Sequence, residues 1–229
     1  HDILLHHPYD SFDIVVNFLR EAACDPAVTE IYHVAYRAGY RSPVMDALQE
    51  AAARGKKVLV YVELKARFDE LNNLRWMRQL RSAGVKVIPP LRGMKVHSKV
   101  TQVIKTSPQG TAAYTHLGTG NYHYGTARQY TDLGLLTKNP VIGAEVTGYF
   151  RSLAAGARLP RFRSLLVAPV NLRGGVLRLI REELEHHQRT GSGLIMAKMT
   201  SLVDPDIIRA LYEASRGGVR VELLVRGIC

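Results

Sequence analysis

Cysteine is scarce in this 229-residue chain, which contains only Cys24 and Cys229. Two cysteines cannot form the disulfide framework of a small secreted domain, and their spacing does not suit a thiolate metal site. Long apolar runs are also lacking, since none approaches the roughly 20 residues that a membrane-spanning helix needs, and no signal peptide is recognisable. We therefore expect a reducing, cytoplasmic setting.

Acidic residues are too few to balance the basic ones. The chain has 20 Asp and Glu against 31 Lys and Arg, which gives a formal net charge of +11. This excess favours polyanionic partners such as nucleic acid, phospholipid headgroups or phosphate chains, and the net charge does not choose among them. Because no known nucleic-acid motif and no interleaving of aromatic with basic residues is present, we expect no nucleic acid as partner.

Segments rich in Val, Ile and Leu alternate with segments of helical periodicity. Residues 31–34 and 57–64 have the strand pattern, and residues 43–54 between them have the helical one. The same rhythm predicts a helix at 73–83 and strands at 85–88, 95–104 and 113–117. The alternation indicates an α/β fold.

An internal repeat relates the two ends of the chain. Residues in 4–21 recur with an offset of 161, and residues in 47–55 recur with an offset of 163. The matching pairs are Leu4/Leu165, Leu5/Leu166, Pro8/Pro169, Val15/Val176, Arg20/Arg181, Glu21/Glu182, Ala47/Ala210, Leu48/Leu211, Glu50/Glu213, Ala51/Ala214 and Gly55/Gly218. The shared order predicts two related domains, 1–164 and 165–229. We expect the second copy, and any site built between the copies, to be incomplete at Cys229.

His97 stands between two lysines in the predicted strand 95–104. A period of two places Lys95, His97, Lys99 and Thr101 on one face. A lone histidine on a strand is more often structural, but flanking lysines suit a phosphoryl group, whose oxygens carry the charge to be stabilised during transfer. A cationic neighbourhood also keeps the imidazole neutral, and only the neutral ring has a lone pair for attack. His97 is therefore the candidate nucleophile.

A glycine-rich turn, His116-Leu-Gly-Thr-Gly-Asn121, follows the strand predicted at 113–117. Its backbone amides could approach an anion and Asn121 could donate a side-chain N–H, although a simple turn is the plainer interpretation.

Three carboxylates, Asp69, Glu70 and Asp132, could orient His97, help to hold magnesium or simply be solvated, and these alternatives stay open. The adjacent pairs His6-His7 and His186-His187 make poor metal sites, because neighbouring side chains diverge.

The His-x-Lys segment and the Gly-x-Gly-Asn turn together resemble the phospholipase D superfamily, which splits phosphate bonds through a phosphohistidine. That superfamily usually has Asp five positions after the lysine, where this chain has Ile104. A closer resemblance, over essentially the whole chain, is to polyphosphate kinases, ATP-dependent enzymes with two phospholipase-D-like domains. It rests on LLHHPYDSFD (4–13), VELKARFDE (62–70), MKVHSK (94–99), HLGTGNY (116–122), TARQYTDLGLLT (126–137) and AKMTSLVDP through VRGIC (197 onward). The departures are YHVAYRAGY (32–40), where the family favours Gln-Thr-Leu-Tyr-Arg, and Thr200, where Asn is usual.

The resemblance implies two phospholipase-D-like domains, each a mixed sheet flanked by helices, with the second truncated. It implies that His97 takes the γ-phosphoryl group of ATP and passes it to the end of a polyphosphate chain, reversibly and with Mg²⁺. The other residues it implies are Lys95, Lys99, Asn121 and His116 as phosphate-binding or supporting groups, Tyr130 and Arg226 as nucleotide contacts, and Arg37 and Arg67 in the neighbourhood of magnesium and phosphate.

The resemblance also implies parts that this chain lacks: a second histidine beyond Cys229 and two N-terminal domains that help to bind the nucleotide base and form dimers. We therefore expect a homo-oligomeric full-length protein and an inactive 229-residue chain. Peripheral membrane association stays open. The alternatives are a phospholipase-D-like phosphodiesterase or nuclease, and a non-catalytic polyanion-binding module.

Overall fold

The computed structural model describes residues 1–66, 69–91 and 93–229. It divides the chain into two compact units, His1–Pro160 and Arg161–Cys229. This division falls four residues before the boundary expected from the repeat. No helix among the described residues is long and apolar enough to cross a membrane.

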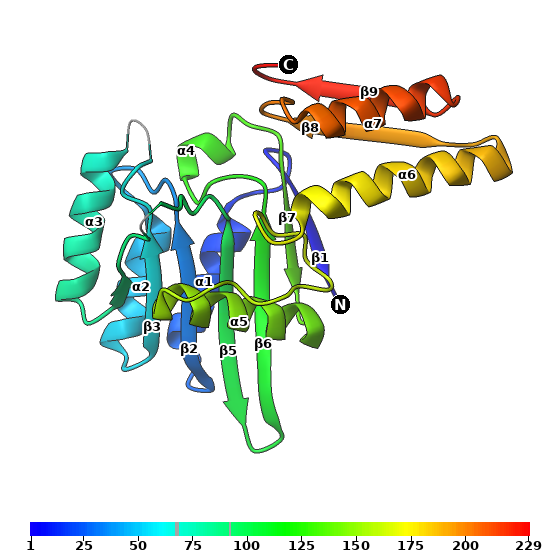
Figure 1. Cartoon of the computed structure of the whole chain (residues 1–229). Coiled ribbons are helices and arrows are strands. Elements are labelled where there is room, and N and C mark those ends of the chain that lie inside the picture. Colours follow the sequence, from blue (N-terminus) through cyan, green and yellow to red (C-terminus); the bar gives the residue numbers. More distant parts are fainter. Residues whose placement is uncertain (67–68, 92) are drawn as a thin grey trace. The chain divides into compact units, whose positions relative to one another are not determined.

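The first unit is built on a mixed seven-stranded sheet in the order β1-β7-β6-β5-β2-β3-β4 (Figure 1). Strands β2, β3 and β4 are parallel, and the other neighbours are antiparallel. The strands are β1 (Ile3–His7), β2 (Val28–Ala35), β3 (Lys57–Val62), β4 (Lys86–Ile88), β5 (Val100–Ser107), β6 (Gly110–Gly118) and β7 (Asp132–Thr137). The helices are α1 (Asp13–Cys24), α2 (Pro43–Ala53), α3 (Glu70–Ser82), α4 (Tyr124–Ala127) and α5 (Pro140–Ala155).

Helices cover both faces of this sheet (Figure 1). Alternate residues of β3, such as Val58 and Val60, join a core with α1 and α2. On the opposite face Tyr32 of β2 meets Phe150 of α5, with ring centroids 5.3 Å apart. Because β3 is buried on both faces, its sequence is a continuous apolar run rather than an alternating one.

Local signals set the limits of the helices. α2 begins with the N-cap Ser42 and proline at its first position, and α5 begins with the N-cap Asn139 followed by Pro140. α5 ends at Gly156, whose φ of 59° is in the left-handed region that glycine adopts without strain. The helices predicted at 43–54 and 73–83 are confirmed as α2 and α3, whose observed limits differ from the predicted ones by at most three residues.

One predicted strand is partly wrong. The structure has no strand at 95–99, and β5 begins only at Val100. Strand β2 pairs with β5 from Thr101 onward, opposite His33. Before that point the backbone N–H of Val96 donates to a side chain, Oε2 of Glu63, at 2.8 Å. His97 therefore lies in a loop, and the expected common face of Lys95, His97, Lys99 and Thr101 does not exist.

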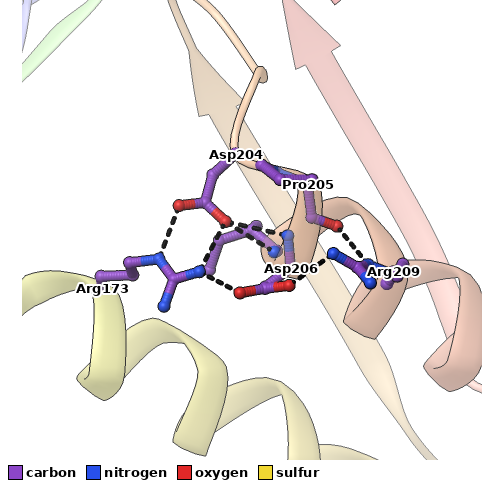
Figure 2. Close-up of polar contacts among 6 residues, drawn as sticks. Arg173, Asp204, Pro205, Asp206 and Arg209 are labelled. Carbon is purple, nitrogen blue, oxygen red and sulfur yellow. Dashed lines mark hydrogen bonds and ion pairs between the residues drawn. The ribbon is translucent and has the colours of Figure 1, made fainter.

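The second unit consists of α6 (Leu172–Thr190), β8 (Leu194–Met199), α7 (Pro205–Arg216) and β9 (Arg220–Val225), with β8 and β9 parallel. Its small core includes Ile180, Leu211 and Val219. Figure 2 shows how α6 is tied to the start of α7. Arg173 donates to Asp204 at 2.7 Å and also contacts Asp206, which accepts a second hydrogen bond from Arg209 at 2.7 Å.

The second unit repeats the order α1-β2-α2-β3 of the first as α6-β8-α7-β9. The helix N-termini correspond closely, because Ser42 and Asp204 both cap a helix with proline at its first position. The turns that follow these helices also correspond, since Gly55 and Gly218 have φ values of 80° and 100°. The structure thus matches the repeat from the first helix onward, whereas residues 165–169, which correspond in sequence to the end of β1, form no strand.

Candidate functional site

The loops that carry Arg37, Lys95, His97 and Asn121 meet at one edge of the seven-stranded sheet. Parallel strands β2 and β3 end there, at Ala35 and Val62. Because β5 is antiparallel to β2, its first residue, Val100, lies at the same edge, opposite Leu117 near the end of β6. Strand β7 begins there too, at Asp132. Ligands of open α/β sheets are commonly bound at such an edge, where strands give way to loops.

The centre of this edge is the pair formed by His97 and Tyr36. The imidazole meets the phenol ring edge to face, with centroids 4.3 Å apart and an interplanar angle of 87°. The Nζ atoms of Lys99 and Lys95 lie 4.9 and 5.5 Å from the same Tyr36 ring. The predicted residues therefore gather around one aromatic ring. Sequence analysis missed Tyr36, although its place directly before Arg37 at the end of β2 was a usable signal.

The electrostatics of His97 favour its neutral form. Partial burial lowers its pKa to about 4, helped by the positive charges of Lys99, Lys95 and Arg37, while Glu63 opposes the shift. The side chain nevertheless keeps an exposed surface. At neutral pH the imidazole is thus uncharged, accessible and able to attack an electrophile.

Lys99 is the most buried of the site cations, with 8% of its surface exposed. Its Nζ donates to the backbone oxygen of His97 at 2.6 Å. Burial lowers the pKa of Lys99 to about 8; Asp132 acts against this shift, and Arg37 adds to it. Lys99 is therefore mostly cationic at pH 7 and is held against the backbone of His97.

His116 lies on β6 in a buried polar cluster. Its Nδ1 is 2.7 Å from the hydroxyl of Tyr122, whose ring centroid is 4.6 Å from that of His33. His33 Nδ1 in turn lies 2.8 Å from the hydroxyl of Thr101. Burial lowers the pKa of His116 to about 4 and that of His33 to about 3. This cluster is a neutral, hydrogen-bonded part of the interior, and His33 was not predicted.

Part of the backbone of the glycine-rich turn is used by the sheet. The N–H of Gly118 donates to Lys99 O and that of Thr119 donates to Leu133 O, both at 2.9 Å, so the sheet already uses them. Gly120 has another reason to be glycine, because a Cβ there would lie 2.4 Å from Oδ2 of Asp132. Asn121 lines a small pocket with His116 and Asp132, and its Oδ1 is buried without a hydrogen bond.

Two of the three predicted carboxylates, Asp69 and Asp132, are engaged in holding loops. Asp69 is buried and accepts the N–H groups of Ala38 and Gly39 at 3.1 Å. Asp132 accepts the hydroxyl of Thr119 at 2.8 Å, and Glu70 is the first residue of α3. Among residues 1–66, 69–91 and 93–229, no three His, Cys, Asp or Glu side chains are grouped as a metal site would need. A magnesium ion held by protein ligands alone does not fit this arrangement.

The remaining predicted residues lie in different places. Arg37 is the second residue after β2, and Tyr130, with 48% of its surface exposed, lies between α4 and β7. Arg226 follows β9 in the second unit, where its guanidinium donates to the hydroxyl of Thr200 at 2.8 Å. Arg67 lies outside the described residues. The structure thus brings together Arg37 and the lysines around His97.

Comparison with solved structures identifies the fold class. The phospholipase D family member Nuc from Salmonella typhimurium superposes on 70% of this chain and 98% of its own, with a TM-score of 0.51 and 16% identity. At that identity the likeness concerns the fold alone. The chain therefore has the phospholipase-D-like α/β fold, with a smaller second unit.

Comparison of the sequence identifies the family. Residues 1–158 match the profile described as polyphosphate kinase C-terminal domain 1, and residues 165–229 match polyphosphate kinase C-terminal domain 2. A polyphosphate kinase from Halalkalibacterium halodurans is 49% identical over the whole of this chain and 32% of its own length. The polyphosphate kinase structure from Porphyromonas gingivalis superposes with a TM-score of 0.87 at 42% identity, over all of this chain and 35% of that one. The chain belongs to the polyphosphate kinase family, and it spans about a third of the length of these relatives.

Proposed function

We propose that this chain forms the phosphoryl-accepting part of a polyphosphate kinase, with His97 as the nucleophile. The observation that carries the proposal is the environment of His97: an accessible imidazole with a pKa of about 4, surrounded by Lys95, Lys99 and Arg37. Those cations suit a reaction in which charge on the transferred phosphoryl oxygens must be stabilised. The names of its relatives supply the substrates, ATP and polyphosphate.

The proposed reaction has two steps. A lone pair of neutral His97 attacks the γ-phosphorus of ATP, an N–P bond forms, and the P–O bond breaks with its electrons leaving on ADP. An oxygen of the terminal phosphate of a polyphosphate chain then attacks the phosphorus of the phosphohistidine. A new P–O bond forms and the N–P bond breaks with its electrons returning to the ring nitrogen of His97, so that the chain grows by one phosphate. The two steps in reverse make ATP from ADP and polyphosphate. The reaction is reversible because the bond broken and the bond formed are both phosphoanhydrides.

Other residues take supporting roles in this proposal. Lys99, Lys95 and Arg37 bind the phosphate oxygens, and Tyr130 and Arg226 contact the nucleotide. Asn121 and His116 support the phosphate-binding edge from their buried pocket. Magnesium would be bound mainly by the phosphates of ATP, because this ion usually has few protein ligands.

The activity is proposed for the full-length gene product rather than for 229 residues alone. In the second unit β8 and β9 pair only with each other among the described residues, and Leu194, Met196 and Leu224 on them are exposed. The equivalent face in the first unit is covered by α5. This exposure supports the proposal that further chain completes the second domain and supplies a partner for His97.

The test is labelling of the full-length gene product with ATP that carries a radioactive γ-phosphate, in the presence of Mg²⁺. We expect acid-labile, base-stable label on the wild type and none on a folded His97→Ala variant. Equal labelling of both proteins, or polymer synthesis without any label, would falsify the assignment of His97. Formation of a cleaved phosphodiester instead of ADP and polymer would favour the nuclease alternative.

A further inference from the structure

The side chain of Glu63 is almost completely buried, with 2% of its surface exposed, directly after β3. Among the described residues it forms no ion pair with any Lys, Arg or His, and three hydrogen bonds engage its carboxylate oxygens. Its Oε2 accepts from the N–H of Val96 at 2.8 Å and from the hydroxyl of Tyr61 at 3.2 Å. Its Oε1 accepts from the N–H of Lys65 at 2.9 Å. A buried carboxylate is unfavourable unless such bonds satisfy it.

The backbone of Glu63 is fixed as firmly as its side chain. Its N–H donates to Ala35 O at 2.9 Å, which joins the end of β3 to the end of β2. Its carbonyl oxygen accepts from Nδ2 of Asn73, a buried residue of α3, at 2.8 Å. The carboxylate therefore projects from a rigid point of the sheet into the loop that carries His97.

The other side of His97 is held independently. The hydroxyls of Ser98 and Tyr149 lie 2.8 Å apart, which ties the residue after His97 to α5. Glu63 ties the residue before it to β3. His97 is thus suspended between two anchors, and neither of its ring nitrogens has a hydrogen-bond partner within the part of the chain that the structure describes. A nucleophile without a side-chain partner depends on its backbone for position.

We propose that Glu63 is a positioning residue for phosphoryl transfer, which holds the His97 loop through the Val96 amide and sets a negative charge beside the imidazole. This inference rests on the proposed function of His97. When the neutral ring bonds to phosphorus and keeps the proton on its other nitrogen, the ring becomes positively charged. Lys95, Lys99 and Arg37 stabilise the phosphoryl oxygens but repel the positive charge on the ring. The negative charge of Glu63 counteracts this repulsion.

The test compares Glu63→Gln with Glu30→Gln in the full-length gene product. Both variants exchange a carboxylate for an amide of the same shape, Glu30 within β2 and Glu63 directly after the neighbouring parallel strand β3. Glu30, which bonds Tyr32 and pairs with Lys57, lies near the start of β2 and far from the loop edge. In single-turnover labelling, Glu63→Gln should slow phosphohistidine formation by about 10- to 100-fold, the size of effect expected when a reacting group is misplaced by an ångström. Glu30→Gln should stay within about twofold of the wild type, because its charge acts at the opposite end of the sheet.

A second readout separates positioning from general destabilisation. Glu63→Gln should lower the pKa of His97, measured by NMR titration of its ring protons, because a negative charge that opposes the downward shift is gone. In the wild type, the Val96 amide should exchange with deuterium much more slowly than the exposed amides of Gly93 and Met94, a result that needs no variant to fold.

The outcomes are distinct for the two proposals. If the wild type forms no phosphohistidine, the proposed function of His97 fails. If the wild type is labelled and Glu63→Gln is labelled at the same rate with an unchanged His97 pKa, the role of Glu63 is refuted while His97 stands. Exchange of the Val96 amide as fast as that of its exposed neighbours also overturns the role of Glu63.

Discussion

The Nζ atom of Lys99 lies 2.6 Å from the backbone oxygen of His97, so a buried cation is bonded to the residue whose imidazole it faces. Lys99 also lies over the ring of Tyr36, which meets the His97 ring edge to face. One side chain thus supports the loop, contributes positive charge and packs against the aromatic ring of the site. Lys99 therefore affects both the position of the His97 backbone and the pKa of the His97 imidazole.

Lys99→Gln should raise the pKa of His97 from about 4, because a positive charge that disfavours the imidazolium is removed. The pKa is measured by NMR titration of the 229-residue chain. Lys86→Gln on β4 is the control, since Lys86 is exposed and is not among the charges that act on His97. Equal His97 pKa values in wild type and Lys99→Gln would contradict the electrostatic account.

Tyr36→Leu should raise the pKa of His97 towards its ordinary value and slow its phosphorylation more than Tyr36→Phe does. Leucine removes the ring against which His97, Lys95 and Lys99 pack, whereas phenylalanine retains it. The two variants are compared in the same labelling and titration experiments. If both variants differ from the wild type to the same extent, the hydroxyl rather than the ring is what matters, and if both match the wild type, the ring has no role.

The chain should lose stability as the pH falls from about 6.5 towards 4. His33 and His116 are buried with pKa values of about 3 and 4, below the ordinary value of 6.5. Over that range the unfolded chain binds protons that the folded chain does not, so each residue destabilises the fold by about 1.4 kcal/mol per pH unit. The loss of stability levels off below the folded pKa values. Above pH 6.5 the two histidines are neutral in both the folded and the unfolded chain, so they no longer reduce the stability.

Urea unfolding at a series of pH values measures this effect. The variant His116→Gln should reduce the slope of the free energy of unfolding against pH by about 1.4 kcal/mol per pH unit between pH 6 and 4.5, which corresponds to one bound proton. His186→Gln on α6 is the control, since His186 is exposed and should leave the slope unchanged. A wild-type slope near zero in this window would show that these histidines are not buried in their neutral form.

Gly120→Ala should destabilise the chain by about 1–3 kcal/mol, the usual effect of forcing an extra group into a packed site. The new Cβ would lie 2.4 Å from Oδ2 of Asp132, which must then leave its bond to Thr119. Gly174→Ala is the matched control, because Gly174 lies in α6 with open space around its Cβ position. That variant should be neutral or stabilising by about 0.5–1 kcal/mol. Thermal or urea unfolding compares the two.

The α/β class and several of its helices and strands could be predicted from residue periodicity, because strand and helix periods are local properties. The internal repeat could be predicted from residues that recur at a nearly constant offset. The segment 95–99 could not, since its residues alternate like a strand while its backbone has no neighbouring strand to pair with. Val96 instead donates to Glu63, 33 residues earlier in the chain. The chain alone also does not reveal that the amides of Gly118 and Thr119 are used by the sheet.

The sequence by itself determined which residues this protein has for its chemistry: His97 between two lysines, the arginine after β2 and the motifs that identify its family. These are matters of composition and short spacing, which the chain carries whether or not it is folded. Only the tertiary structure decided what surrounds them. Tyr36 meets His97, Glu63 holds the loop and His33 joins His116 in the interior because strands far apart in sequence end at the same edge of one sheet.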